Sequence, residues 1–323
     1  MADESPSLHL PARDIPIPQS VSKPARSILA LGLFPSDDYP PLEDPAAWRD
    51  MMARQNELHL SLMARTVGGV KAESTLLDLD GVAVYELTPD DLEPDDARVV
   101  LEVHGGSFIT GAGELCRVAG LRSLSRSGCR TWAVDYRMPP DHPYPTPLDD
   151  CVHAYRTLLK DHRPEEIVVM GGSAGGNLAA ALIVKARDEG LALPAAAVLD
   201  TPEADLTESG DSFQTNLGLD NVLVRSLMPA NLLYAGGHDL TDPYLSPLFT
   251  DFTKGFPPTL LTTGTRDLFL SNTVRFHRAL RAAGVAAELH VCEAGGHGVY
   301  FGQAPEDEEI ESEVRRFIAE HWG

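Results

Sequence analysis

The stretch VVMGGSAGGNLAAALIV, residues 168–184, sets four glycines around one serine. An apolar run typical of a buried strand precedes the glycines, and an alanine-rich run typical of a helix follows them. Ser173 then occupies the tight turn between strand and helix, within the pattern G-x-S-x-G at 171–175. In this context the pattern predicts a nucleophile elbow, where glycines remove side chains that would collide with the neighbouring strand and helix. The alternative is a turn whose small residues only allow close packing.

The chain around this stretch alternates between short β-like runs and helical patterns from about residue 75. This rhythm predicts an α/β fold with a mostly parallel central sheet that helices cover on both faces. Helices are expected over 148–160 and 272–283, and an amphipathic final helix is expected to begin near the acidic cluster 306–313. Strands are expected in RVVLEV (98–103), RTWAVDY (130–136), EIVVMG (166–171), AAAVLD (195–200), PPTLLTTG (257–264) and AAELHVCE (286–293), after a hairpin in LLDLDGVAVYEL (76–87) that turns at Asp80-Gly81.

Two segments break this rhythm. Residues 1–70 are helical or irregular, and residues 206–233 are inserted between a late strand and the next strand–helix unit. Ligands of open α/β sheets bind beyond the carboxyl ends of the strands, so both segments are expected to meet there as a cap. We therefore predict an N-terminal cap segment at 1–70 and a catalytic domain at 71–323 with a cap insertion at about 206–233.

A serine nucleophile needs a base and an orienting carboxylate. His297 lies between glycines after the expected strand 286–293, and Asp267 follows the expected strand 257–264. The chain order Ser173, Asp267, His297 is the order of α/β-hydrolases. We predict that these three residues form the catalytic triad. The rivals are His290 as the base, which lies inside its strand pattern, and Asp239, Asp242 and Glu293 as the acid.

A second glycine-rich turn follows the expected strand 98–103, in HGGSF at 104–108. Backbone N–H groups in such a turn can stabilise an oxyanion together with the amide that follows the nucleophile. We predict an oxyanion hole from Gly105, Gly106 and Ala174, with His104 as a structural side chain that holds the loop. Ser107 and Phe108 are candidate substrate-binding residues; for Phe108 the alternative is a place in the core.

The composition excludes several other function classes. The chain has 323 residues, 43% of them hydrophobic, which is enough for a sizeable core. Its formal charge of −22 should repel nucleic acid and anionic membrane surfaces. We find no signal peptide and no apolar run long enough to span a membrane, so a cytoplasmic protein is expected. The four cysteines lack metal-ligand spacing and are expected to be buried free thiols: Cys116, Cys129, Cys151 and Cys292.

Taken together, the motifs resemble the hormone-sensitive-lipase-like (family IV) esterases and lipases of the α/β-hydrolase fold. The resemblance covers roughly residues 98–302. It implies a serine carboxylesterase with a helical cap, and it assigns the triad and oxyanion roles to the residues proposed above. The matching stretches are HGGSF, DYRMPPDHPYPTPLDD (135–150), GGSAGGNLA, PEADLT, DPYLSPLF (242–249), PPTLLTTGTRDLFLS and GGHG.

The chain departs from this family at two positions. Ser107 stands where the family usually has a third glycine, which adds bulk and a hydroxyl beside the acyl site. Gly172 stands before the nucleophile, where the family commonly has an acidic residue or threonine. Neither change touches the triad, so the departures indicate a divergent subgroup that keeps its activity.

These observations predict the hydrolysis of short- to medium-chain carboxylic esters through an acyl-enzyme on Ser173. The protein supplies the base and the oxyanion donors, so no metal and no organic cofactor is expected. The partner is a small ester substrate. Lactones, amides and carbamates remain alternative substrates, and a non-catalytic small-molecule-binding protein on the same scaffold is the alternative from another class. A homodimer through the cap or an edge strand, as happens in the family, also stays open.

Overall fold

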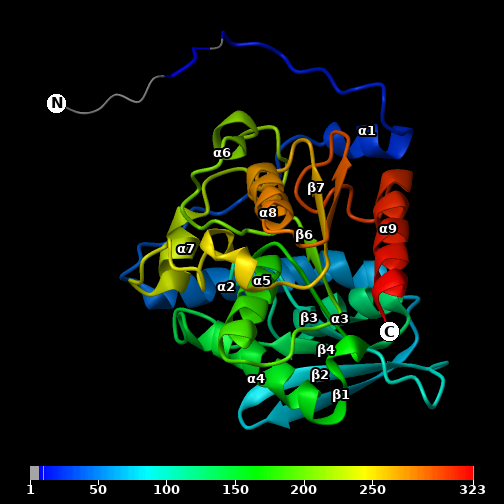
Figure 1. Ribbon diagram of the computed structural model, residues 1–323. Coiled ribbons are helices and arrows are strands. Elements are labelled where there is room, and N and C mark those ends of the chain that lie inside the picture. The colour runs from blue at the N-terminus through cyan, green and yellow to red at the C-terminus, as the bar shows by residue number, and fades with distance from the viewer. Residues whose placement is uncertain (1–6, 10, 323) are drawn as a thin grey trace.

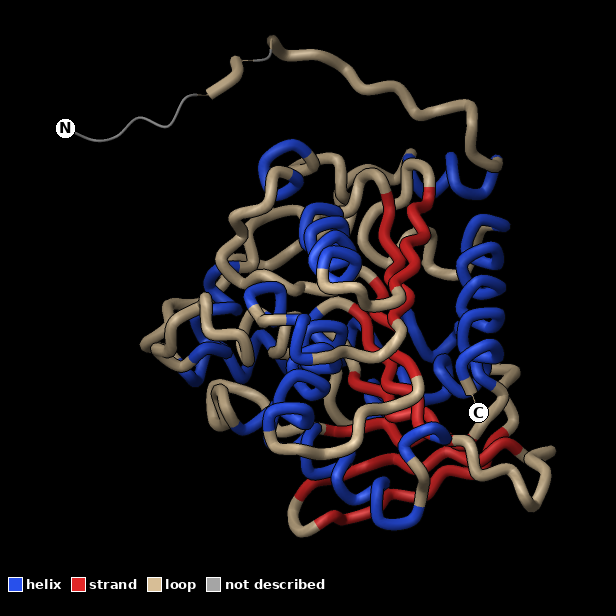
Figure 2. Tube along the Cα trace, in the orientation of Figure 1, coloured by secondary structure: helices blue, strands red, loops and turns tan. Residues whose placement is uncertain are grey.

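The computed structural model describes residues 7–9 and 11–322, and its centre is one twisted eight-stranded sheet (Figures 1 and 2). The strand order is β1-β2-β4-β3-β5-β6-β7-β8. Pairing is antiparallel between β1 and β2 and between β2 and β4, and it is parallel from β4 to β8. The strands are β1 (Ala72–Leu79), β2 (Val82–Pro89), β3 (Val99–Val103), β4 (Arg130–Asp135), β5 (Ile167–Gly172), β6 (Ala196–Asp200), β7 (Thr259–Gly264) and β8 (Ala287–Cys292).

The predicted α/β class is confirmed, and each expected strand is present. The hairpin turns at Asp80-Gly81, where both residues adopt positive φ, as a two-residue turn between twisted strands requires. Helices α4 (Thr146–Asp161) and α8 (Leu270–Ala282) cover the two ranges expected to be helical. The sequence reading did not single out α3 (Glu114–Ser127), the crossover helix between β3 and β4.

Helices cover both faces of the sheet because its central strands are apolar on both sides. Along β3, Leu101 belongs to the core under α4, α5 (Ala174–Asp188) and α8, whereas Val100 belongs to the core on the opposite face. That opposite face is covered by α9 (Pro305–His321) and α3, which lie together to one side of the sheet in Figure 1. The apolar side of α9 is buried as its sequence pattern predicted, through Ile310, Val314, Phe317 and Ile318.

The N-terminal segment and the 206–233 insertion contact each other at one end of the molecule. Helix α2 (Pro45–Met63) buries Trp48 and Met51 in a small cluster with Ala230 of α7 (Met228–Ala235). Ile109, next to the HGGSF turn, completes this cluster. Two segments that are about 180 residues apart in sequence therefore pack over the same loop of the catalytic domain.

The state of the cysteines and the length of the helices relate to two of the sequence predictions. All four cysteines are buried free thiols, as predicted. Within the described ranges, no helix is both long and apolar enough to cross a membrane.

The chain before α2 also forms a short helix, α1 (Lys23–Leu29). Its N-cap Ser22 donates two hydrogen bonds to the Glu306 carboxylate, from the backbone N–H at 2.6 Å and from the hydroxyl at 2.8 Å.

Candidate active site

Ser173 lies in a strained turn between β5 and α5. Its φ is +58° and its ψ is −126°, a conformation that side chains rarely adopt. Its N–H donates to the carbonyl of Asp200 on β6 at 2.9 Å, which fixes the turn to the neighbouring strand. The flanking glycines are required sterically, since a Cβ on Gly171 would lie 2.4 Å from the Gly175 oxygen and one on Gly175 would lie 2.0 Å from the Val103 oxygen.

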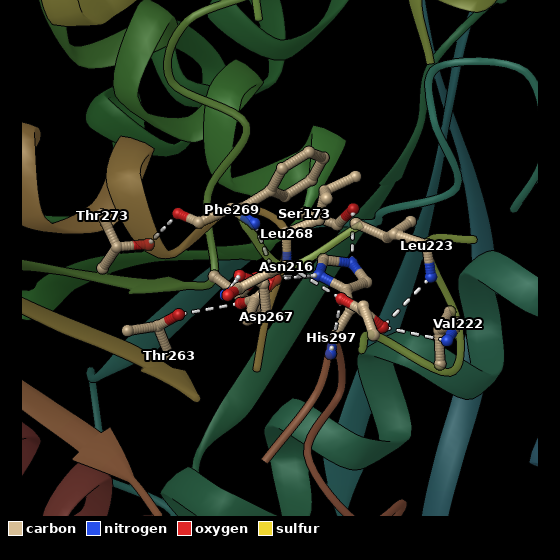
Figure 3. Close-up of polar contacts among 12 residues, drawn as sticks. Ser173, Asn216, Val222, Leu223, Thr263, Asp267, Leu268, Phe269, Thr273 and His297 are labelled. Carbon is tan, nitrogen blue, oxygen red and sulfur yellow. Dashed lines mark hydrogen bonds and ion pairs between the residues drawn. The ribbon is translucent and has the colours of Figure 1, made fainter. Parts of the chain in front are cut away.

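The structure brings the three predicted triad residues together (Figure 3). The Ser173 hydroxyl oxygen lies 2.9 Å from His297 Nε2, and His297 Nδ1 lies 3.2 Å from Asp267 Oδ1. Ser173 comes from the elbow after β5, Asp267 from the loop after β7 and His297 from the loop after β8. All three therefore lie at the carboxyl edge of the parallel sheet, where this fold class binds ligands.

Asp267 is fully buried, and hydrogen bonds hold its carboxylate in place. Oδ2 accepts from the Thr263 hydroxyl at 2.8 Å, and Oδ1 accepts from the Phe269 N–H at 2.9 Å. Burial raises the pKa of Asp267, but the charge and hydrogen bond of His297, with further donors, lower it below its usual value. The carboxylate is thus ionised and oriented toward the imidazole.

His297 is only 9% exposed. Burial lowers its pKa, but the hydrogen bond and charge of Asp267, aided by Asp220 and Glu203, raise the pKa above the usual histidine value. The Thr201 hydroxyl lies 2.8 Å from Nδ1, closer than Asp267 does, so Thr201 and Asp267 share the Nδ1 side of the ring. With Nδ1 engaged there, Nε2 can accept the serine proton.

Two polar residues of the 206–233 insertion hold the loops of this triad. Asp220 Oδ2 accepts the N–H groups of Leu268 at 2.9 Å and His297 at 3.2 Å. The amide of Asn216 donates to the carbonyl of Asp267 at 2.8 Å. The sequence analysis missed both, as well as Thr201, because single polar residues in an irregular segment carry no pattern.

The HGGSF turn approaches the elbow closely. A Cβ on Gly105 would lie 2.7 Å from the Gly172 carbonyl oxygen and 3.2 Å from Ser173 Cβ, so only glycine fits. Ala174 is the first residue of α5, and its N–H therefore has no acceptor within the helix. The positive end of that helix dipole also lies at Ser173. The predicted oxyanion residues Gly105 and Ala174 thus flank the hydroxyl, with Gly106 following at φ +119°.

The side chains of this turn have separate structural roles. His104 stacks on Tyr136 at 4.1 Å between ring centroids, and the Tyr136 hydroxyl donates to the His104 carbonyl at 2.9 Å. Phe108 is fully buried and stacks on Tyr234 of α7 at 4.0 Å. Phe108 therefore belongs to the core, the alternative stated for it above. Ser107 has φ +53°, a conformation that explains why glycine suits this position.

The other departure, Gly172, has room for a side chain. A Cβ there would lie 3.6 Å from Asp200 Cβ, which is an ordinary contact. Glycine at this position is not a steric requirement, unlike Gly171 and Gly175.

In the described part of the chain, none of the rival residues is hydrogen-bonded to Ser173 or His297, whose partners are given above. His290 is in the middle of β8, opposite Thr262 of β7. The carboxylates of Asp239 and Asp242 accept hydrogen bonds from Thr241 and Tyr244 close to them in sequence, and Glu293 is exposed.

One group of side chains in the described part of the chain lies close enough together in space to hold a metal ion. The ligand atoms of His104, Cys116 and Asp135 lie within 4.8 Å of one another. His104 Nδ1 lies 2.8 Å from the Gly105 carbonyl, which leaves Nε2 as the free nitrogen. The residues are distant in sequence and have no metal-ligand spacing, so the sequence analysis did not find the group. None of them is part of the proposed triad.

Comparison with known families gives a match over residues 100–301 to the model of an alpha/beta hydrolase fold family. Among curated relatives, an esterase of Acinetobacter venetianus is 31% identical over 191 residues, which are 58% of this chain and 63% of that protein. An acetyl-hydrolase of Streptomyces hygroscopicus is 34% identical over 64% of this chain and 70% of its own. The esterase LipU of Mycobacterium tuberculosis is 32% identical over 70% of this chain and 79% of its own.

Solved structures match over nearly the whole chain. The crystal structure of an esterase named E25 superposes with a TM-score of 0.90 at 34% identity, over 98% of this chain and 99% of that one. An esterase described as belonging to the bacterial hormone-sensitive lipase family superposes with a TM-score of 0.77 at 27% identity, over 94% of this chain and all of that one. The likeness therefore includes both segments that were predicted to form the cap.

Proposed function

Because the chain belongs to the hormone-sensitive-lipase-like family of the α/β-hydrolase fold, we propose that it is a serine carboxylesterase acting on short- to medium-chain esters. The observation that carries this proposal is the 2.9 Å approach of His297 Nε2 to the Ser173 hydroxyl at a strained elbow. The two alignments cover 63% of the length of the Acinetobacter esterase and 70% of the length of the Streptomyces acetyl-hydrolase. The family likeness therefore supports esterase activity for the aligned catalytic domain of this chain.

The proposed reaction has two steps. His297 Nε2 takes the Ser173 proton while the serine oxygen attacks the ester carbonyl carbon. The amides of Gly105, Gly106 and Ala174 stabilise the tetrahedral oxyanion, and the protonated His297 gives its proton to the leaving alcohol. A water molecule then attacks the acyl-enzyme with His297 as its base, which releases the acid and restores the serine.

Asp267 supports this cycle without exchanging a proton. Its ionised carboxylate stabilises the imidazolium that forms twice in each turnover. Its low pKa keeps it ionised at neutral pH. Asp220 and Asn216 hold the loops of the base and the acid, which makes both of them positioning residues.

We also propose that residues 1–70 and the 206–233 insertion act as the cap over this site. The packing of Trp48 against Ala230 supports a joint role. A cytoplasmic location and a homodimer stay predictions. Lactones, amides and carbamates remain alternative substrates, since the same acyl-transfer steps apply to them.

The test is steady-state hydrolysis of p-nitrophenyl esters of increasing acyl length by the wild type and by Ser173→Ala. Serine-dependent turnover supports the proposal, and Ser173→Ala should lower kcat by about 10⁴-fold or more. A folded Ser173→Ala variant that keeps most of the rate contradicts the proposed nucleophile. Absence of turnover on every ester by the folded wild type would favour the binding-protein alternative.

A further inference from the structure

Thr201 directly follows β6, at the edge of the sheet where the proposed triad lies. Its backbone N–H donates to the Thr262 carbonyl of β7 at 2.7 Å, and the residue is 7% exposed. Its φ is +43°, a value that is strained for a β-branched side chain. Strained backbone of this kind persists where the surrounding structure fixes it, and it is frequent at functional sites.

The Thr201 hydroxyl is the nearer of two acceptors at His297 Nδ1. Thr201 Oγ1 lies 2.8 Å from this nitrogen, and Asp267 Oδ1 lies 3.2 Å from it. When Nε2 is free to accept the serine proton, the neutral imidazole carries its own proton on Nδ1. This Nδ1–H group then faces both oxygens, and its shorter hydrogen bond is the one to Thr201.

The Thr201 hydroxyl also has a proton to donate. A hydroxyl whose oxygen accepts one hydrogen bond can donate another. The acceptor is the carboxylate of Asp267, since a hydrogen bond from the Thr201 side chain is among the contacts that lower the pKa of Asp267. Thr201 therefore bonds to the proposed base through its oxygen and to the proposed acid through its proton.

The backbone next to Thr201 also holds the nucleophile. The carbonyl of Asp200 accepts the Ser173 N–H at 2.9 Å. The Asp200 side chain is fixed in turn, because its Oδ1 accepts from the Thr262 hydroxyl at 2.7 Å and its Oδ2 binds the Arg126 guanidinium. The end of β6 thus contacts the nucleophile through a backbone carbonyl and the base through the Thr201 side chain.

We propose that Thr201 is a positioning residue that holds the imidazole of His297 jointly with Asp267. This inference rests on the proposed ester hydrolysis at Ser173. The His297 Nδ1–H donates to the Thr201 oxygen, the Thr201 hydroxyl donates to the Asp267 carboxylate, and no proton leaves Nδ1 in either step of the reaction. The imidazolium that forms when Nε2 takes the serine proton is a stronger donor than the neutral ring, so both acceptors stabilise the charged form more.

A competing explanation is that Thr201 only packs at the end of β6. Two substitutions separate the explanations. Thr201→Val exchanges the hydroxyl for a methyl group of similar size and keeps the β-branched shape. Thr201→Ser keeps the hydroxyl and removes the methyl group. A positioning role requires the hydroxyl, whereas a packing role requires the β-branched shape.

The readout is the steady-state hydrolysis of p-nitrophenyl butyrate. Thr201→Val should lower kcat at least about fivefold, as expected for the loss of hydrogen bonds to charged groups. KM should change by less than about twofold, because the lost bond strengthens only in the transition state. Thr201→Ser should keep at least about half of the wild-type kcat, since its hydroxyl can make the same bonds.

Thr259→Val is the matched control. Thr259 is a fully buried threonine, and its hydroxyl donates to the Pro257 carbonyl at 2.9 Å. It begins β7, at the opposite end of that strand from the loop that carries Asp267. This variant loses a buried, hydrogen-bonded hydroxyl and should keep the wild-type kcat. Urea denaturation of every variant shows whether the proteins compared are folded.

Two results would overturn the inference: a loss of kcat below about fivefold in Thr201→Val, or a loss in Thr201→Ser as large as in Thr201→Val. The second result would assign the side chain a packing role. If Thr201→Val does not fold, Thr201→Ala replaces it, because Thr201→Ala and Thr201→Ser differ only in the hydroxyl. Serine-dependent hydrolysis with a fully active Thr201→Val removes this inference alone. No hydrolysis of any ester by the folded wild type removes the proposed function as well.

Discussion

Asp220 accepts a hydrogen bond from the backbone N–H of His297, although the two residues are 77 positions apart in the chain. The same carboxylate oxygen binds the N–H of Leu268, the residue after Asp267. The other oxygen accepts from Val222 at 2.9 Å and from Leu223 at 3.1 Å. One buried carboxylate of the cap insertion thus joins the loops that carry the proposed base and acid.

Asp220→Asn should lower kcat about tenfold or more. The amide replaces one acceptor oxygen with an NH2 donor, so backbone N–H groups that hold the loops of His297 and Asp267 would lose their acceptor. It should also move the acid limb of kcat/KM to lower pH, since Asp220 is one of the charges that raise the pKa of His297. The measurement is the pH–rate profile with p-nitrophenyl butyrate. Asp205→Asn is the control, because this carboxylate, which directly precedes the insertion, accepts instead from Thr207, Ser209 and Arg275. Equal shifts of the acid limb in the two variants would contradict the assignment.

The pH dependence of the wild type follows from the direction of the His297 shift. The base works only when it is neutral, so kcat/KM should rise with pH through the pKa of His297 in the free enzyme. Since that pKa is raised, the midpoint of the acid limb should lie above the usual histidine value of about 6.5. A midpoint clearly below this value would show that burial outweighs the charge of Asp267.

The elbow glycines should differ in their tolerance to alanine. Gly175→Ala places a methyl group 2.0 Å from the Val103 oxygen and should lower the free energy of unfolding by at least about 2 kcal/mol, with loss of activity. Gly172→Ala makes only 3.6 Å contacts and should change stability by less than about 0.5 kcal/mol. Urea denaturation of both variants measures the difference. Equal destabilisation would contradict the close approach of the elbow and the HGGSF turn.

Ser107→Gly should stabilise the protein by roughly 0.5–1 kcal/mol. Serine at φ +53° carries strain of about 1–2 kcal/mol, which exceeds the extra entropy that glycine loses on folding. Ser107→Ala keeps the strained conformation and should give no gain. The midpoints and slopes of urea denaturation decide between these outcomes. A gain in Ser107→Ala as large as in Ser107→Gly would point to the hydroxyl as the source of the instability.

Much of this site follows from local sequence patterns. Ser173, Asp267 and His297 each follow an apolar strand run, and parallel strands bring their carboxyl ends to one edge. The same logic placed Gly105 near the nucleophile, because it lies in a glycine-rich turn directly after the strand expected at 98–103. Hydrophobic periodicity also fixed the buried face of α9. Such features depend on residues close in sequence.

The remainder depends on tertiary packing. Asp220 looks like an ordinary acidic residue in an irregular segment, and only the fold shows that four backbone N–H groups donate to its carboxylate. The core position of Phe108 depends on Tyr234, which lies more than 120 residues away. The crossover helix α3 was missed because its apolar residues are interrupted by arginines and serines.

The shared cluster of Trp48, Met51, Ala230 and Ile109 has a consequence for engineering the protein. A graft of one cap segment from a homologue would leave half of this cluster without its matching surface. Chimeras that exchange α2 and α7 together should express and fold better than those that exchange either alone. In the same way, substitutions that adapt the cap to a new substrate should arise as compensating pairs, one in each segment.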